Sequence, residues 1–463
     1  MRALLALGKT EEDGDAIAVM LDGLGKDEPI PSLDEVRRKL KSGQDLTEKL
    51  TVGDWLDNWL KQEQGSHRRA TAVFYEGHVR MYLKPLIGHI RIDRLTVGHL
   101  VEMDNKILDA NDAIVAANED RRTLLAQIKA TSKRAEKRRL REQLDAMPPF
   151  RRPVGPTSRQ RIRATLRAAI NDAITQQRCT FNPASHWQIP AKKPRPIIWT
   201  AERVEEWRRT GLRPSPVMVW TPTLAGAFLD YVAEQDPDFE PLWHLAVKRG
   251  LRRGELAGLP WTEIDLDAAT LTVSMQLTEV EYEIEEGAPK SAAGERTIPL
   301  DAETVQLLRA HRTRQRKERL RLGGAWVESG KVFTRPNGSA LRPSWIGDQF
   351  EKLYTAAGLP PLRLHDTRHT AATLMLAAGI DLKIIQSTLG HSALATTSDL
   401  YTSVLPQVAQ AAAEATAAIL PRAPRGTLGH PSGTHEAVAG LSTRGGDTPE
   451  NQKPQLDGGL SAV

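Results

Sequence analysis

Apolar residues recur at helical spacing through the first half of the chain. In the segment 51–60 they stand three or four positions apart, on one face of a helix: Val52, Trp55, Leu56, Trp59 and Leu60. Similar spacing predicts three more helices, at 69–83 (ending before Pro85), 96–108 and 157–177. The pattern therefore predicts an all-α region over residues 51–189.

A charged segment interrupts this region. Residues 111–144 are helical in pattern, but charges of both signs mix along them, and prolines from Pro148 onward end the pattern. The plain interpretation is a solvated helical hairpin. Residues 119–163 nevertheless contain 14 Lys or Arg and 5 Asp or Glu. Such a local excess is typical of a phosphate-binding surface.

Prolines and basic residues mark the middle of the chain, because residues 190–222 contain six prolines and predict a linker. Beyond it, apolar alternation predicts strands at 270–277, about 280–284 and 296–300, and helical spacing returns at 303–320 and 345–357. The predicted fold is multidomain. An all-α domain precedes an α+β domain at 223–421 that is mainly helical with a small antiparallel sheet.

The two ends of the chain differ from the rest. Residues 1–50 are mixed, and over 1–30 they are neither strand-like nor basic; Ser32 and Glu35 have the spacing of a capping box. After residue 421 the composition turns to Gly, Pro, Ser and Thr, so residues 422–463 are predicted to be a disordered tail.

Composition narrows the class of protein. The chain has 463 residues, of which 40% are hydrophobic, and a net charge of only +5. This length allows two or three domains with apolar cores. The single cysteine, Cys179, excludes an internal disulfide and a cysteine-rich zinc module. No apolar run approaches the roughly 20 residues that span a bilayer. We expect a cytoplasmic, nucleoid-associated protein with no membrane contact.

Six residues carry the candidate chemistry: Arg252 in Gly-Leu-Arg-Arg-Gly-Glu, Lys290 in Pro-Lys-Ser, His365 and Arg368 in His-Asp-Thr-Arg, His391 in Leu-Gly-His, and Tyr401. Guanidinium groups stay charged and bind two phosphate oxygens at once, so Arg252 and Arg368 are candidates for holding a phosphodiester. We read Glu255 as structural, an internal partner for an arginine.

The other four groups suit the breaking of a DNA strand. A tyrosine phenol has a pKa of about 10 and needs a base, and His365 can accept its proton. Tyr401 can then attack phosphorus and become linked to the 3′-phosphate. Lys290 can protonate the leaving 5′-hydroxyl, and His391 can hydrogen-bond the phosphate. Arginines would take the place of a metal clamp, so we expect no metal, ATP or other cofactor.

In this order and at these spacings the motifs resemble the tyrosine recombinase (phage-type integrase) family, over roughly residues 50–420. The resemblance implies that a helical core-DNA-binding domain (51–189) and a catalytic domain (223–421) clamp double-stranded DNA attachment sites. It also implies that four protomers assemble on two duplexes. An excisionase or a host DNA-bending protein is a possible further partner. Residues 1–50 would then be the remnant of an arm-binding region, and residues 105–156 a charged insertion beyond what the core of the family needs.

Several alternatives stay open. A catalytically silent DNA-binding regulator of the same fold and a type IB topoisomerase-like enzyme would share much of this pattern. His365 and His369 stand four apart like zinc ligands, but Asp366 follows where the zinc motif has Glu, and His369 is read as a helix-packing residue. The alanine-rich segment 404–420 suits either packing on its own domain or docking on a neighbouring protomer.

Overall fold

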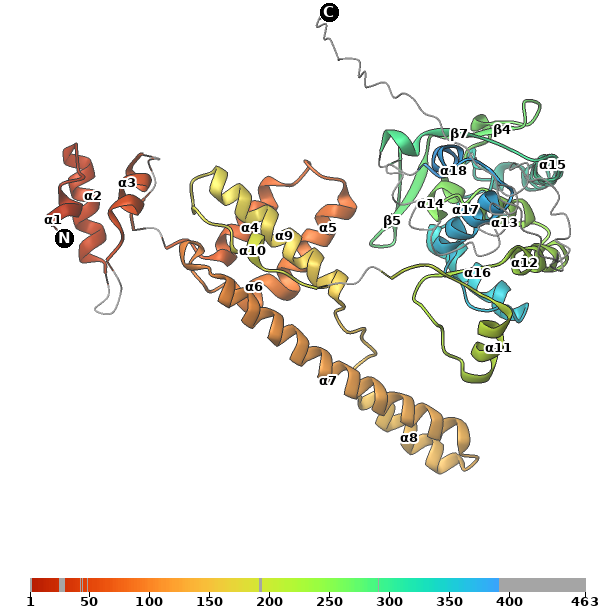
Figure 1. Ribbon diagram of the computed structural model, residues 1–463, viewed down its shortest axis with the longest axis horizontal. Coiled ribbons are helices and arrows are strands. Elements are labelled where there is room, and N and C mark those ends of the chain that lie inside the picture. Colours follow the sequence, from red (N-terminus) through yellow and green to blue (C-terminus); the bar gives the residue numbers. More distant parts are fainter. Residues whose placement is uncertain are drawn as a thin grey trace, which may run out of the picture. The chain divides into compact units, whose positions relative to one another are not determined.

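The computed structural model describes residues 2–24, 30–41, 43, 45–47, 49–190, 194–289 and 291–390. Within these residues the chain is mainly helical, with three small sheets (Figure 1). Lys290, His391 and Tyr401 lie outside the described residues, as do the segments 404–420 and 422–463.

The N-terminal segment is helical where it is described. Helices α1 (Arg2–Leu5), α2 (Glu11–Asp22) and α3 (Leu33–Lys41) enclose a small apolar cluster of Leu4, Ile17, Met20, Val36 and Leu46. The Ser32 hydroxyl accepts a hydrogen bond from the backbone N–H of Glu35 at 3.2 Å, which is the first half of the predicted capping box.

A second apolar core lies within residues 52–189. Its elements are α4 (Val52–Gln62), α5 (Arg69–His78), a π-helical turn (Val79–Leu83), α6 (Lys84–Ile87), a 3-10 turn (Ile92–Arg94), α7 (Val97–Ala130), α9 (Pro156–Thr175) and α10 (Pro183–His186). Most of the predicted apolar face of α4 is buried, and Trp55 donates its indole N–H to the Ala169 carbonyl of α9 at 2.8 Å. The helix predicted to end before Pro85 instead continues, because Pro85 falls in the first turn of α6, where no N–H is required.

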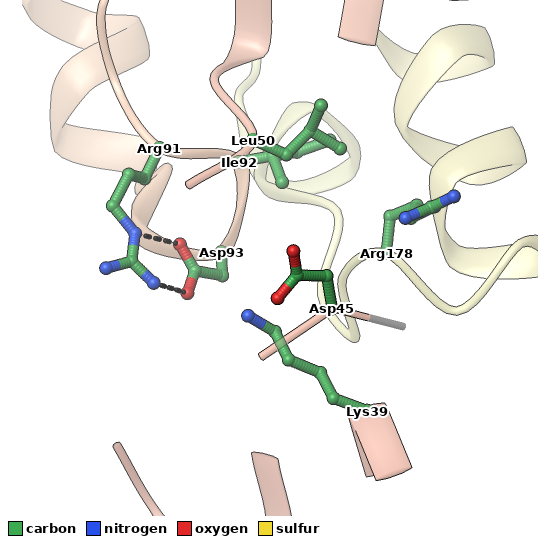
Figure 2. Close-up of a pocket in the computed structure, with 7 residues that line it drawn as sticks. All are labelled: Lys39, Asp45, Leu50, Arg91, Ile92, Asp93 and Arg178. Atoms are coloured by element: carbon green, nitrogen blue, oxygen red, sulfur yellow. Dashed lines mark hydrogen bonds and ion pairs between the residues drawn. The ribbon is translucent and has the colours of Figure 1, made fainter. Parts of the chain in front are cut away.

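A charged pair lies at the surface of this core. Figure 2 shows the Arg91 guanidinium and the Asp93 carboxylate joined by two hydrogen bonds of 3.1 and 2.7 Å. They line a small pocket together with Lys39, Asp45, Leu50, Ile92 and Arg178. Burial alone would raise the pKa of Asp93, but the bonds and charge of Arg91 outweigh it and hold the pKa below its usual value.

The predicted helical hairpin is present. Helix α7 is 34 residues long and continues through the break expected after residue 108, and α8 (Arg134–Ala146) runs back along its far end (Figure 1). The return segment 147–155 follows α7 toward the core, held by side chains of α7. The hairpin is therefore an extension of the same long helix that forms part of the core.

The predicted linker is shorter than expected. From Ile197 onward the segment forms β1 (Ile197–Ile198), α11 (Ala201–Thr210) and β2 (Met218–Val219), and β1 pairs in parallel with β2. Trp199 and Trp220 are buried in the largest apolar core. The indole N–H of Trp199 donates to the Pro361 carbonyl, and that of Trp220 donates to the Pro360 carbonyl. Because these partners are distant in the sequence, the proline-rich composition gave no indication of this packing.

Two antiparallel sheets follow. Strands β3 (Ile264–Asp265), β4 (Thr270–Val273) and β7 (Arg296–Pro299) form one sheet with β4 in the centre, and β5 (Gln276–Val280) and β6 (Glu283–Gly287) form a separate hairpin. The prediction of one strand over 270–277 is wrong, because these residues belong to two sheets. The predicted strand at 280–284 contains the hairpin turn, where Glu281 and Tyr282 have positive φ.

Helices supply most of this core: α12 (Pro222–Gln235), α13 (Glu240–Lys248), α14 (Arg253–Gly258), α15 (Ala302–Leu322), α16 (Pro343–Ala356), α17 (Thr367–Ala377) and α18 (Leu382–Leu389). Aromatic rings of Trp220, Phe228, Trp243 and Phe350 pack together at its centre. Helix α13 is buried along almost its whole length and packs against α17. Among the described helices, none combines the length and apolar character needed to cross a membrane.

Candidate active site

Arg252 lies at the start of α14, directly after a tight turn. Gly250 adopts φ +64°, and a Cβ there would meet Leu389 Cδ2 at 2.8 Å and Arg368 Cα at 3.1 Å. Arg252 is the N-cap residue of α14, and its backbone N–H donates to Glu255 Oε2 at 2.9 Å. Its guanidinium donates to Glu255 Oε1 at 2.5 Å, yet a third of the side chain remains exposed. The Gly-Leu-Arg-Arg-Gly-Glu motif thus holds an arginine at the edge of a buried carboxylate.

Arg296 is the second cation on Glu255. Its Nη2 lies 2.9 Å from Glu255 Oε2, and its Nε donates to the Thr388 carbonyl at 2.7 Å. Burial alone would raise the pKa of Glu255, but the hydrogen bond and charge of Arg296, together with Arg368, hold it below its usual range. Glu255 therefore stays ionised, and the prediction that it is an internal partner for an arginine is confirmed.

Arg368 is almost completely buried, in the first turn of α17. Its Nη1 donates to the Gly250 carbonyl and its Nη2 to the Leu389 carbonyl. Burial lowers its pKa, and the neighbouring positive charge of Arg252 lowers it further. The guanidinium remains protonated at neutral pH, since arginine keeps its charge in proteins.

Both arginines reach the same stretch of backbone. Arg368 binds the carbonyl of Leu389, and Arg252 Nη2 donates to the next carbonyl, that of Gly390, at 3.3 Å. Gly390 ends α18 in the left-handed conformation, and a Cβ there would lie 2.6 Å from the Ala293 carbonyl oxygen. The structure therefore brings Arg252 and Arg368 together at the residue that precedes His391 in the sequence.

His365 lies in a short 3-10 turn, Leu364–Asp366. The buried carboxylate of Asp366 in this turn accepts two hydrogen bonds from the Arg363 guanidinium, at 2.7 and 2.8 Å. The His365 ring is exposed and lines the same pocket as Arg252. Loss of hydration to the surrounding protein and the charge of Arg368 nevertheless lower the pKa of His365. The imidazole is thus neutral at pH 7 and able to accept a proton.

His369, one turn further along α17, is half-buried. Its ring stands edge-on to that of His365, with centroids 6.4 Å apart. Burial lowers its pKa to about 4, and its Nδ1 has no hydrogen-bond partner in the described part of the chain. These features fit the helix-packing interpretation.

Sequence reasoning missed Arg296. Its signal was present, because Arg296 and Ile298 share the inward face of β7, and an arginine on the inward face of a strand requires a buried partner. Lys331, a second lysine in this part of the chain, is buried and forms an ion pair with Glu286.

Comparison with known proteins finds a family and relatives that this chain resembles. Residues 232–407 match the model of the Phage integrase family. A tyrosine recombinase XerC-like protein of Caldanaerobacter subterraneus subsp. tengcongensis is 36% identical over 178 residues, covering 36% of this chain and 46% of the relative. The ICEBs1 integrase of Bacillus subtilis is 23% identical over 238 residues, covering 51% of this chain and 62% of the relative.

A solved structure shares the fold. The Tn1549 transposon integrase, in complex with transposon right end DNA, aligns with a TM-score of 0.51 at 21% identity, covering 79% of this chain and 99% of that chain. The chain spans about half to three-fifths of the length of the two curated relatives. Over residues 232–407, and over the stretches shared with these relatives, the chain is similar to the tyrosine recombinase (phage integrase) family.

Proposed function

We propose that this protein is a site-specific recombinase that cuts and rejoins double-stranded DNA through a 3′-phosphotyrosyl intermediate. One observation carries the proposal. Two guanidinium groups, Arg252 and Arg368, meet on the backbone of Leu389 and Gly390, beside a neutral, exposed His365. In a chain of the integrase family, this is a cationic site with a proton acceptor at its edge.

In the proposed reaction the Tyr401 oxygen attacks the phosphorus of a phosphodiester. A bond forms between that oxygen and phosphorus, and the bond from phosphorus to the 5′-oxygen breaks. His365 takes the phenol proton, and Lys290 gives a proton to the departing 5′-oxygen. Rejoining is the reverse, with a 5′-hydroxyl of the partner strand as the nucleophile.

The charges that develop on the phosphate are met by groups of the chain itself. Arg252 and Arg368 face the non-bridging oxygens, and His391 adds a hydrogen bond. Removing one such preorganised donor typically slows a reaction about 10²–10³-fold. The phosphoester bond is kept in the tyrosyl intermediate, so the reaction needs no ATP, and the proposed step uses neither a metal nor another cofactor.

The proposal extends to the organisation of the protein. Residues 51–189 bind DNA, with 105–156 as an insertion, and the catalytic domain ends near residue 421. The complex of the Tn1549 integrase with transposon right end DNA supports duplex attachment sites as the substrate. Four protomers would act on two duplexes in the cytoplasm, with an excisionase or a host DNA-bending protein setting direction, to move a mobile element such as a viral genome.

The test uses a nicked duplex taken from the DNA that flanks this gene. Wild type and Tyr401→Phe are incubated with it in chelator, and covalent protein–DNA adducts are separated under denaturing conditions. We expect an adduct with wild type and none with Tyr401→Phe, while both shift the duplex on a native gel. A shift without an adduct for wild type would favour the non-cutting DNA binder, and an adduct with Tyr401→Phe would exclude Tyr401 as the nucleophile.

A further inference from the structure

The hairpin of α7 and α8 is held in a fixed direction by polar side chains. Asn111 both donates to and accepts from the backbone of Val154, at 3.1 and 2.7 Å. Asn118 is buried and donates to the Arg151 carbonyl at 2.8 Å, and Arg121 donates to the Pro148 carbonyl at 2.8 Å. The return segment is therefore tied along α7, and the hairpin extends as an ordered arm (Figure 1).

The outer helix of this arm carries one strongly basic face. Arg134, Lys137, Arg138 and Arg141 are spaced i, i+3, i+4 and i+7, which places them on one side of α8. This set is called the α8 basic face. Three of its side chains are exposed and Lys137 is half-buried. Along the helix the face spans about 10 Å, close to the rise of three base pairs of duplex DNA.

Most of these charges are not neutralised by the residues that the structure describes. Arg138 has a weak ion pair with Glu142 at 3.7 Å. In the part of the chain that the structure describes, Arg134, Lys137 and Arg141 form no ion pair. Four arginines of α15 differ from this set: Arg309, Arg314, Arg319 and Arg321 each pair with a carboxylate, at 2.7 to 3.3 Å.

The distribution of charge on α8 also destabilises this helix. The N-cap residue of α8, Lys133, makes no side-chain cap, and Arg134 follows in the first turn. The last turn holds acidic Asp145 and no basic residue. Arg134 at the start and an acidic residue without a basic one at the end are unfavourable for the helix dipole, although Glu136 in the first turn is favourable. Like charges at i, i+3 and i+4 also repel one another. No residue of α8 is buried, so packing does little to offset this cost.

We propose that the α8 basic face binds the phosphate backbone of duplex DNA, as a contact surface separate from the site that cuts the strand. The proposal rests on the proposed function only in that the substrate is duplex DNA. A row of phosphates supplies the negative charge that α8 lacks, and an ordered arm presents the four side chains at little further cost in entropy. Phosphate contacts are independent of sequence, so the arm adds affinity without adding base recognition.

The test is the salt dependence of binding to a random-sequence duplex of about 60 base pairs, long enough for an arm to reach beyond one helical turn. The α8 variant carries Arg134→Gln, Lys137→Gln, Arg138→Gln and Arg141→Gln in the full-length chain. The matched control carries Arg309→Gln, Arg314→Gln, Arg319→Gln and Arg321→Gln. Both variants lose four positive charges, but those of the control are already paired.

We expect the slope of log K against log salt to become shallower in the α8 variant. The change should be about 0.9 for each phosphate that the arm no longer neutralises, hence about two to four units in total. The slope of the control should stay within about one unit of wild type. Because the α8 variant also loses self-repulsion, its unfolding temperature should equal or exceed that of wild type.

An unchanged slope in the α8 variant would overturn the proposal, and an acidic protein surface would become the better candidate partner. An equal reduction in both variants would also overturn it, since bulk charge would then suffice. A lower unfolding temperature with an unchanged slope would mean that the four residues serve the fold. None of these outcomes bears on strand cleavage, which the Tyr401 adduct tests separately.

Discussion

Arg296 and Glu255 form a buried ion pair that joins strand β7 to the first turn of α14. The Nη2 of Arg296 lies 2.9 Å from Glu255 Oε2, and the two side chains are 5% and 1% exposed. The same guanidinium binds the carbonyls of Gly294 and Thr388. One arginine therefore fixes three segments: the helix that begins at Arg252, the strand that follows Lys290 in the sequence, and the end of α18.

Replacing this arginine should destabilise the protein strongly. In Arg296→Met the carboxylate of Glu255 would stay buried, with Arg252 as its only hydrogen-bonded cation and Arg368 nearby. Removing one partner of a buried pair costs about 3–5 kcal/mol when the remaining charge is not compensated, so Arg252 and Arg368 should keep the loss at or below that range. Urea unfolding of wild type and variant at neutral pH measures this cost as a difference in the free energy of unfolding.

The matched control combines Arg296→Met with Glu255→Gln, which removes the negative charge of Glu255. The double variant should recover part of the lost stability, since a neutral amide is easier to bury. If the single variant lost less than about 1 kcal/mol, or the double variant were the worse of the two, Arg296 would not be compensating a buried charge.

Gly250 should tolerate no side chain. Its φ of +64° strains any L-residue, and a Cβ would lie 2.8 Å from Leu389 Cδ2 and 3.1 Å from the backbone of Arg368. Gly250→Ala should therefore unfold at lower denaturant and lose cleavage, because it displaces both Arg368 and the end of α18. Circular dichroism and the adduct assay measure the two effects.

Gly226 provides the comparison for that substitution. It lies within α12, and a Cβ there would meet nothing within 4 Å. Gly226→Ala should raise stability by up to about 1 kcal/mol, through higher helix propensity. Equal stability losses in the two alanine variants would show that the close packing of Gly250 is not what matters.

The residues around Arg252 explain how far sequence reasoning reached. The sequence predicted features that depend on residues close to one another in the chain. These are the charged group of Arg252, the tight turn at Gly250, and Glu255, three positions after Arg252, as the partner of an arginine. Arg296 was missed because its partners, Glu255 and Thr388, are 41 and 92 positions away in the sequence. Nothing local distinguishes such an arginine from a surface one, except its inward place on β7.

Errors in the fold have two origins. Alternation predicted the strand pattern near Tyr282 but not the turn, because an exposed aromatic residue fits the outer face of a strand equally well. Six prolines predicted a linker, while Trp199 and Trp220 in the same segment are anchored by carbonyls 162 and 140 positions away. Long-range contacts decided the case of the two tryptophans, whereas the turn at Tyr282 joins two strands that are adjacent in the sequence. The assignments of Lys290, His391 and Tyr401 stay predictions, since these residues are outside the described ranges.

Cleavage should depend on pH through His365. Partial loss of hydration and the charge of Arg368 lower the pKa of His365 below its ordinary value, so the proton-accepting neutral form dominates at pH 7. The single-turnover cleavage rate should therefore be level near neutrality and fall only below about pH 6.5. A pH profile on the nicked duplex measures this.

Two variants identify the group that titrates. In His365→Ala the cleavage rate should no longer fall at acidic pH, and cleavage should be about 10²–10⁴-fold slower. His369→Gln should keep the fall, because the pKa of His369 is already lowered to about 4. An acidic fall that survives in His365→Ala would assign the titration to another group.

Asp301 should make the free energy of unfolding of its apolar core depend on pH in the acidic range. Its carboxylate caps α15, accepting from the Thr304 N–H at 3.1 Å, and pairs with Arg249 at 3.1 Å. Burial alone would raise its pKa, but the hydrogen bonds from Thr304 and the charges of Lys248 and Arg249 lower it to about 2. The ionised form thus stabilises the fold fully above the unfolded pKa of about 3.9, and this contribution is lost as pH falls through about 2.

The variant Asp301→Asn separates the charge from the cap, because it keeps a capping oxygen but removes the negative charge. A third of the side chain is exposed, so solvent screens the pair and the loss at pH 7 should be only about 1 kcal/mol. Unfolding free energies of the two proteins should therefore differ at pH 7 and converge toward pH 2. A difference that stayed constant with pH would mean that the cap, not the charge, stabilises α15.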